Sequence, residues 1–424
     1  MPSNSSENLT VSQRLFEPLT EIWPHVTTSM ACPKLPDNAF LRLGVSRVLS
    51  QAKSGRDFLQ LHAEAASVDP ISVSHFFETI KSERREGVCA EVNKRLCASV
   101  RARCADPFAS IKDLVNFDIY AGDGHYIEAS AHEDFIDGEK RPVGHFYIFN
   151  LRSRALQHFA LGLTDKELER KREHDMHAIK RRGLAALRFD AKKGRQVMIV
   201  WDKAGIDFSL WSKAKESGVY FLSREKENMT LERIRQLPFD PDSEFNEGVI
   251  TDEMVVSTQG VVLRRVVYYD CVGDVEYTYL SSNLTLPPGL LVLLYKRRWD
   301  IEKAFDETEN RYQESKAWAK SPTAKRIQAH LICVTHNLCL LMEECLATDE
   351  QIRNEPEIKR RAVKRTILEA KLALKQQKLP FIYKVIDRLT QRGVKLVRWI
   401  RNHLYALRHW NIAVGMLRRV YARL

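Results

Sequence analysis

Two short apolar runs in the middle of the chain constrain the fold most, because each has the composition of a buried strand and each leads to an aspartate. Residues 117–121 precede Asp123 in the sequence YAGDGHY, and residues 196–201 (QVMIVW) end at Asp202. Such runs are typical of strands in a sheet that helices cover. Further strands are predicted at 144–151 and 218–222, with helical patterns at 164–188 and 207–217. This alternation predicts a mixed α/β layer fold.

The remaining patterns divide the chain into three regions. Residues 1–110 read as short helices, which form either a small helical bundle or a helix-turn-helix. Within residues 111–345, the segment at about 229–286 alternates as strands at 249–257, 261–269 and 275–280 and forms a β-rich insertion. A long helical stretch follows Pro287, and residues 346–424 form a basic helical C-terminal region.

The positive charge of the protein is concentrated near the C-terminus. The whole chain has 66 Lys and Arg against 55 Asp and Glu, a net charge of +11. Residues 351–424 hold 19 basic and 4 acidic residues (+15), so the other 350 residues hold 47 and 51 (−4). The basic stretches there are amphipathic and predict helices with one packed and one basic face. This positive charge predicts a polyanionic partner. Binding to the DNA backbone, with marked salt dependence, is favoured over a helix that lies on a membrane surface.

Cysteine spacing and the apolar runs predict an intracellular protein. No two of the eight cysteines are spaced C-x-x-C, and Cys89, Cys97 and Cys104 recur as buried thiols on one helix face would. The first residues lack the features of a secretory signal, and the longest apolar stretches are shorter than the ~20 residues of a spanning helix. We expect a cytoplasmic, nucleoid-associated protein with no membrane partner. The histidine spacing disfavours structural zinc.

Asp123 and Asp202 are the first candidates for chemistry. Aspartates at the carboxyl ends of neighbouring strands can converge on one small volume. Facing carboxylates repel each other unless a proton or a divalent cation lies between them, and Mg²⁺ needs few protein oxygens. The alternative for each aspartate alone is a turn former or a helix cap.

The third candidate is Glu302, in the helical run YKRRWDIEKAFDETENRY. At about 100° per residue, Tyr295, Arg298 and Glu302 fall in one stripe, which Ile301 and Phe305 would press onto the sheet. Glu302 is not the only acid with this geometry. Asp306 and Glu309 share its face, whereas Asp300 and Glu307 point away. An Arg298–Glu302 pair can also be an ordinary helical ion pair.

Together these residues resemble the DDE transposases of bacterial insertion sequences. The similarity consists of Asp123-Gly124, Asp202 after its apolar strand, and Tyr295-x2-Arg298-x3-Glu302. It points to the group with the signature Y-x2-R-x3-E-x6-K, whose Y-x-x-R-W-x-I-E-x-x-F run is close to YKRRWDIEKAF here, and it covers roughly residues 116–340. One position departs from the signature, because Glu309 stands where that group has lysine. The nearest basic residues after it in the sequence are Arg311 and Lys316.

The resemblance implies a ribonuclease-H-like mixed-sheet core with a β-rich insertion before the last catalytic helix. Asp123, Asp202 and Glu302 would hold two Mg²⁺ ions, for which Mn²⁺ would substitute. Further residues receive roles in contacting DNA. The expected phosphate contacts are Tyr295, Arg298, Arg224 and Lys316, and the candidates for stacking on a displaced base are Trp299 and Trp318, for which helix packing is the alternative.

The leading hypothesis is therefore a DNA transposase that cuts at terminal inverted repeats and joins the 3′ ends to target DNA. Its expected partners are double-stranded DNA, both transposon ends and target, and a second copy of the chain in a homodimer on DNA. A metal-dependent nuclease on the same core is one alternative. A non-catalytic DNA-binding regulator is the other, and Glu309 leaves room for it. Removal of residues 355–424 is expected to weaken DNA binding and leave the three acids in place.

Overall fold

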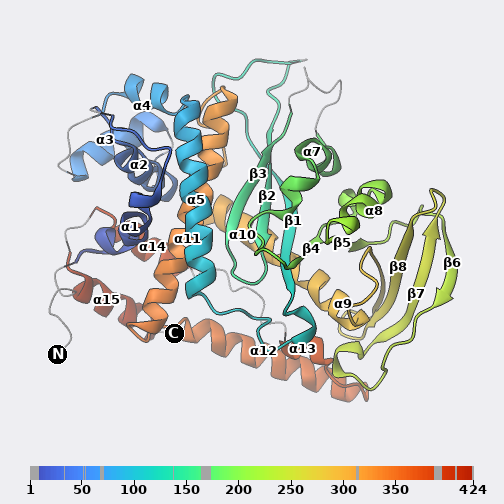
Figure 1. The fold of residues 1–424 in the computed structure, drawn as a ribbon. Coiled ribbons are helices and arrows are strands. Elements are labelled where there is room, and N and C mark those ends of the chain that lie inside the picture. The colour runs from blue at the N-terminus through green and yellow to red at the C-terminus, as the bar shows by residue number, and fades with distance from the viewer. Residues whose placement is uncertain are drawn as a thin grey trace.

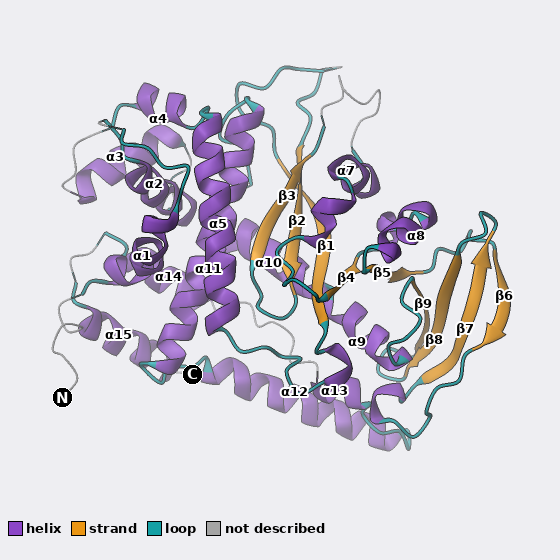
Figure 2. Cartoon of the chain, viewed as in Figure 1, coloured by secondary structure: helices purple, strands orange, loops and turns teal. Residues whose placement is uncertain are grey.

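The computed structural model describes residues 9–422 except 33, 51, 53, 67–70, 137, 164–172, 312–314, 386–393 and 406–407. Within this part of the chain, nine strands form one mixed sheet in the order β3-β2-β1-β4-β5-β9-β8-β7-β6. Helices lie on both faces of the sheet, and a separate group of helices stands beside its β3 edge (Figures 1 and 2). The predicted mixed α/β sheet with flanking helices is present.

The first five strands in this order hold the centre of the sheet. They are β1 (Phe117–Ile127), β2 (Val143–Asn150), β3 (Leu156–Leu161), β4 (Gln196–Val200) and β5 (Val219–Arg224). β2 pairs antiparallel with both β1 and β3, while β1, β4 and β5 run parallel. The sequence had predicted that this strand ends before Asp123. β1 instead continues to Ile127, so Asp123 lies within the strand. β3 was not predicted.

The β-rich insertion extends this same sheet. Its strands are β6 (Leu231–Gln236), β7 (Val249–Ser257), β8 (Val262–Asp270) and β9 (Val275–Ser281). β9 pairs antiparallel with the end of β5, so the insertion prolongs the central sheet along its β5 edge. The three strands predicted here are confirmed as β7, β8 and β9. The fourth strand, β6, lies at the sheet edge with most of its residues exposed, and it lacks the alternation that marks a half-buried strand.

The two faces of the sheet bury different helices. α9 (Pro288–Arg297) and α10 (Trp299–Arg311) cover one face, where Ala121, Val200, Leu293 and Ile301 belong to a single apolar cluster. α7 (Asp175–Arg182) and α8 (Phe208–Glu216) cover the other face. Part of the helix predicted over 164–188 falls on residues 164–172, which lie outside the described residues.

A helical layer beside β3 joins segments far apart in the sequence. Its helices are α1 (Val11–Ile22), α2 (Asp37–Leu49), α3 (Gly55–Ala66), α4 (Val73–Thr79), α5 (Glu83–Arg103), α11 (Pro322–Thr348), α14 (Val394–His403) and α15 (Trp410–Ala422). They share one apolar core, in which Cys89 and Cys97 of α5 are buried. All eight cysteines are free, as expected for reduced thiols. α11 is long and apolar enough to cross a membrane, but 72% of its apolar window is buried against neighbouring elements.

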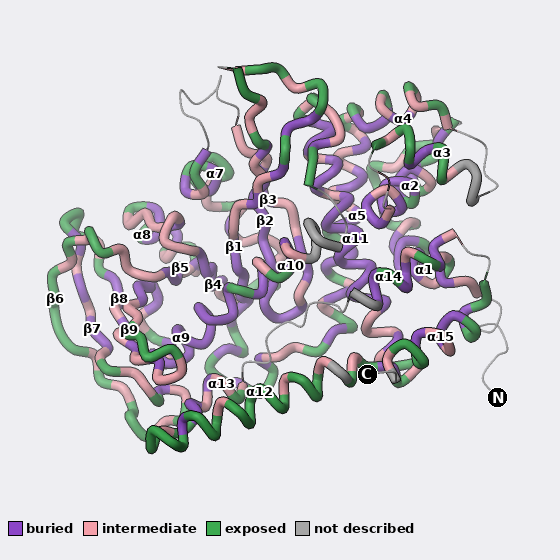
Figure 3. Tube along the Cα trace, turned by 180° about the vertical axis from the view of Figure 1, so that it is seen from behind, coloured by how far each residue is buried: buried purple, intermediate pink, exposed green. Residues whose placement is uncertain are grey.

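The basic C-terminal region is not one structural unit. α12 (Glu355–Leu374) is exposed along most of its length (Figure 3) and leads to α13 (Phe381–Val385). Its apolar Val363, Ile367 and Leu374 are exposed, so the packed face predicted for this helix is wrong apart from Leu372. By contrast, Trp399 of α14 is buried in the helical core. Removal of residues 355–424 would therefore take away part of that core, and the predicted truncation does not isolate DNA binding.

Candidate active site

The pairing of two parallel strands brings Asp123 and Asp202 to the same level of the sheet. Ala121 of β1 is in register with Val200 of β4, and two residues further on lie Asp123, still within β1, and Asp202, just past the end of β4. Since side chains alternate between faces, both aspartates lie on the face that carries Ala121 and Val200, beneath α9 and α10. The convergence expected from the sequence therefore follows from the strand register.

Local hydrogen bonds fix both carboxylates. Asp123 Oδ1 accepts a hydrogen bond from the backbone N–H of Gly124 at 2.9 Å. Asp202 Oδ1 accepts one from the N–H of Ala204 at 2.8 Å and so caps a single turn of 3₁₀ helix. The Ser223 hydroxyl donates to the Asp202 carbonyl at 2.8 Å, which ties the loop to β5.

Arg298 links Asp123 to Glu302. Its Nη1 lies 3.0 Å from Asp123 Oδ2 and its Nη2 lies 2.6 Å from Glu302 Oε1. Arg298 sits at the junction of α9 and α10, and α10 packs across β1 and β2. The Arg298–Glu302 pair is thus more than the ordinary helical ion pair considered from spacing, because the same guanidinium also binds a strand residue. Only 8% of the Arg298 side chain is exposed, so the contact is largely screened from water.

The protonation of Asp123 reflects this crowding. Burial raises the pKa of its carboxyl to about 7; Arg298 opposes the rise, and the nearby Asp175 and Asp202 carboxylates add to it. Burial acts to lower the pKa of Arg298, but the surrounding acids outweigh it and raise that pKa overall. The site therefore gathers more negative charge than one arginine balances.

Trp201 and Asp175 belong to this neighbourhood and were not singled out from the sequence. The Trp201 indole N–H donates to Asp175 Oδ2 at 2.7 Å, and the ring is fully buried. A Cβ at Gly122 would lie 2.0 Å from the Trp201 ring, and one at Gly205 would lie 2.6 Å from it. Trp201 thus packs between the backbone that precedes Asp123 and the backbone that follows Asp202. The glycines beside the two aspartates were the signal that could have revealed this close packing.

Three predicted DNA contacts lie near Arg298 or Tyr295. Tyr295 is buried, with its ring 5.1 Å from that of Tyr279, and the Arg298 guanidinium lies 5.9 Å from the Tyr295 ring. Arg224 ends β5 with its guanidinium 4.6 Å from the Tyr277 ring. Trp299 is 48% exposed beside Arg298, so its ring has surface available for stacking.

The other two predicted contacts lie elsewhere. Lys316 is held by a backbone bridge to Glu128, five residues beyond Asp123, which places it roughly 17 Å along the strand direction. Trp318 packs near Phe76, with the Arg47 guanidinium 5.4 Å from its ring. Trp318 thus packs in part against the helical layer, its stacking on a base stays a prediction, and neither residue lies beside the acids.

The remaining acidic residues of α10 differ in burial and in ion pairing. Asp300 is buried and bound to Arg297 Nε at 2.6 Å, which satisfies it away from the three candidates. Asp306 is half-buried one turn beyond Glu302. The side chains of Glu307, Glu309 and Arg311 lie outside the described residues, so the position of the signature lysine has no structural description.

The chemistry of the donor set fits a hard divalent cation. Asp123, Asp202 and Glu302 offer only carboxylate oxygens, which are the ligands Mg²⁺ prefers. Among the described residues, no three His, Cys, Asp or Glu side chains are gathered closely enough to hold a metal ion. In this structure the guanidinium of Arg298 supplies the positive charge between Asp123 and Glu302.

Comparison with known proteins points to one class. Residues 150–338 match the family model described as "Transposase DDE domain". This part of the chain is similar to a transposase. The match includes Asp202, Arg298 and Glu302 and begins after Asp123. The putative transposase y4zB of Sinorhizobium fredii (strain NBRC 101917 / NGR234) is 26% identical over 161 residues, which cover 35% of this chain and 45% of that protein. Both matches thus cover less than half of the chain.

Proposed function

We propose that the protein is a DNA transposase that cuts DNA at terminal inverted repeats and joins the freed 3′ ends to target DNA. One observation carries the proposal: Asp123 within β1 and Asp202 just after β4 lie level on two parallel strands, and Arg298 ties Asp123 to Glu302. The similarity of residues 150–338 to the transposase DDE domain supports it. The strand order β3-β2-β1-β4-β5 with its mixed pairing supports a ribonuclease-H-like core.

Asp123, Asp202 and Glu302 would hold two Mg²⁺ ions, and Mn²⁺ would substitute for them. When bound, such ions activate the attacking oxygen and stabilise the leaving 3′-oxygen of a phosphodiester. The protein supplies the positions of the acids and excludes water from one side of them. Arg298 would contact the scissile phosphate through its paired donors, with Tyr295 and Arg224 beside it.

The spacing of Tyr295, Arg298 and Glu302 supports assignment to the group with the Y-x2-R-x3-E-x6-K signature. Glu309 stands in place of the signature lysine. We therefore propose that another basic residue of this protein makes the phosphate contact that the lysine makes in that group.

The exposed helix α12 supports the proposed macromolecular partners. Its lysines and arginines would bind the backbone of transposon-end and target DNA. Val363, Ile367 and Leu374 form an exposed apolar stripe at helical spacing, which favours pairing with a second copy in a homodimer on DNA. We propose a cytoplasmic, nucleoid-associated location on the same grounds. The proposed regions are 1–110 for DNA-end binding, 111–345 for catalysis, and 346–424 for DNA binding or dimerisation.

The test is a Mg²⁺-dependent cleavage and joining assay on DNA that carries the cognate inverted repeats. Both cleaved ends and joined products are expected from the wild-type chain, and Asp202→Asn is expected to abolish both. Cleavage without joining would identify a nuclease on the same core. DNA binding without either product would identify a regulator, and each of these results would contradict the proposal.

A further inference from the structure

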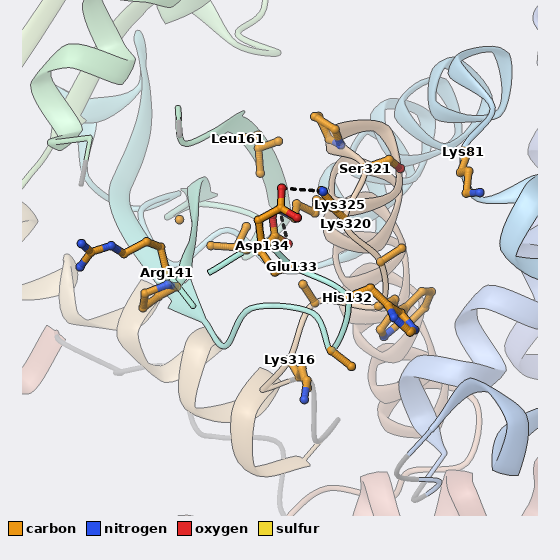
Figure 4. Close-up of a pocket in the computed structure, with 18 of the residues that line it drawn as sticks. Lys81, His132, Glu133, Asp134, Arg141, Leu161, Lys316, Lys320, Ser321 and Lys325 are labelled. Carbon is orange, nitrogen blue, oxygen red and sulfur yellow. Dashed lines mark hydrogen bonds and ion pairs between the residues drawn. The ribbon is translucent and has the colours of Figure 1, made fainter. Parts of the chain in front are cut away.

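A large groove lies between the helical layer and the sheet, away from the three acids. It has a volume of about 1300 Å³. Its walls come from α2–α4, from the segment after β1, from the ends of β2 and β3, and from the segment that leads into α11 (Figure 4). This volume exceeds the several hundred Å³ typical of small-ligand pockets.

The groove has an excess of positive charge. Seven of its lining residues are Lys or Arg and three are Asp or Glu. The three acids are already paired: Glu133 with Lys325 at 3.0 Å, Asp134 with Lys320 at 2.6 Å, and Glu173 with Arg181, which is outside the groove lining, at 2.8 Å. Two further cations pair with acids outside the groove lining, Lys81 with Glu78 at 2.8 Å and Arg141 with Glu139 at 3.8 Å.

Two of these cations are available to a ligand. Lys316 and Arg56 are exposed, and within the described part of the chain neither forms an ion pair. They come from different elements, since Arg56 belongs to α3 and Lys316 to the segment before α11. In Figure 4, the Lys316 and Lys81 side chains border the groove from different elements.

Apolar and aromatic side chains line the groove between the cations. They include Phe77, Tyr126, Ile136, Leu161 and Trp318. Positive charge that tracks a backbone, combined with aromatic and apolar surface for bases, is typical of sites for unpaired nucleic-acid strands. A duplex keeps its bases stacked inside and would use only the charges.

The groove lies near the carboxyl end of β1, beyond the candidate active site on the same strand. Tyr126 lines the groove three residues beyond Asp123, ~10 Å along the strand, with its side chain on the opposite face of the sheet. Ala317 also lines the groove and packs with Ile127, whose side chain lies on the Asp123 face. The backbone N–H of Glu128 donates to the Ser315 carbonyl at 2.7 Å, and this contact fixes the segment that carries Lys316 against the end of β1. A strand held with one phosphate at Asp123 would reach Lys316 within a few nucleotides.

We propose that this groove binds an unpaired stretch of the DNA strand next to the phosphodiester that is cut. The inference rests on the proposed function and adds the form of DNA and the place where it lies. Lys316 and Arg56 would contact phosphates, and the apolar surface between them would contact bases.

The test is the binding of a fluorescent twelve-nucleotide oligo(dT) strand, and of the matched duplex, to the full-length chain across a salt series. Lys316→Ala with Arg56→Ala is expected to weaken single-strand binding about tenfold and to reduce the salt slope by about 1.4. The matched control removes two charges from α12, with Lys364→Ala and Lys371→Ala, and is expected to weaken duplex binding more than single-strand binding.

Equal single-strand affinity for both double variants, or no binding of the strand by the wild-type chain, would overturn the proposal. Failure of the groove is distinguishable from failure of the transposase function. If only the groove proposal fails, the Lys316→Ala, Arg56→Ala variant binds the single strand as tightly as the wild-type chain does, and it still cuts and joins DNA. If only the transposase function fails, the strand binds in the groove but the wild-type chain gives no cut or joined product.

Discussion

Charged side chains are mostly buried and paired at the candidate active site, whereas along helix α12 they are mostly exposed. At the site, Arg298 is nearly buried and bonds to two carboxylates at once. Along α12 the basic side chains are exposed, with Glu357 pairing with Arg360 and Arg361. The charges at the site are thus held by one another away from water, whereas those along α12 stay exposed, as charges that contact a long polyanion would. The near-neutral body and the basic C-terminal region reflect this division.

The largest expected effect breaks the charge pairing at the site. Arg298→Ala leaves Asp123 and Glu302 without their cation, and removal of one partner from a buried ion pair is strongly destabilising. We expect the free energy of unfolding to fall by about 3 kcal/mol at neutral pH, measured by urea denaturation, with partial recovery in Arg298→Lys. The matched control on the other side of the comparison is Arg360→Ala on α12, where an exposed pair contributes ~0–1 kcal/mol. Equal losses in both variants would contradict the contrast.

In a third region, a cluster of histidines is buried, and burial keeps their imidazole rings neutral. His145 Nδ1 lies 3.3 Å from His158 Nε2, and the His158 and His330 rings are 5.2 Å apart. Burial lowers the pKa of His145 to about 3 and that of His330 to about 4. The unfolded chain takes up protons below about pH 6.5, before the folded chain does, so stability is full above that pH and falls as the pH drops toward 4.

Removal of one of these histidines is expected to flatten that pH dependence. In His330→Phe, the slope of unfolding free energy against pH between 6 and 4.5 should decrease by about 1.4 kcal/mol per pH unit. Denaturant unfolding at a series of pH values measures it. An unchanged slope would show that His330 gains its proton in the folded chain as readily as in the unfolded chain.

The smallest effect on stability is expected on α12. Replacement of Lys359, Lys364 and Lys371 by Gln should leave the unfolding midpoint unchanged, because these side chains are exposed. If each contacts one phosphate of duplex DNA, the slope of log affinity against log salt should fall by about 2.7. Titrations at several salt concentrations measure this change, and an unaltered slope would remove α12 from the DNA-binding surface.

The parts of the fold predicted from sequence are those where burial dictates composition. β4 is apolar from Val197 to Val200 because both of its faces are covered, and its run could be recognised directly. β6 could not, since an exposed edge strand carries charges on both faces. The amphipathic pattern of α12 predicted a packed face, but tertiary contacts cover little beyond Leu372.

The candidate site was predicted as far as local spacing reaches. The strand ends and the helical stripe pointed to Asp123, Asp202 and Glu302, and their catalytic role stays a prediction. Lys316 and Trp318 follow Glu302 closely in sequence, yet a backbone contact with Glu128 carries their segment to the groove. Asp175 lies near Asp123 and accepts a hydrogen bond from the Trp201 indole, a contact that no sequence spacing signals.

The most direct test compares two acids on the same helix. Glu302 and Asp306 share a face of α10, and Glu302 is joined to Asp123 through Arg298. Single-turnover cleavage of inverted-repeat DNA with Mg²⁺ would be measured for Glu302→Gln and Asp306→Asn. We predict a loss of at least about 1000-fold for Glu302→Gln and a change of less than about threefold for Asp306→Asn. Normal cleavage by Glu302→Gln would contradict the assignment of these acids as the catalytic centre.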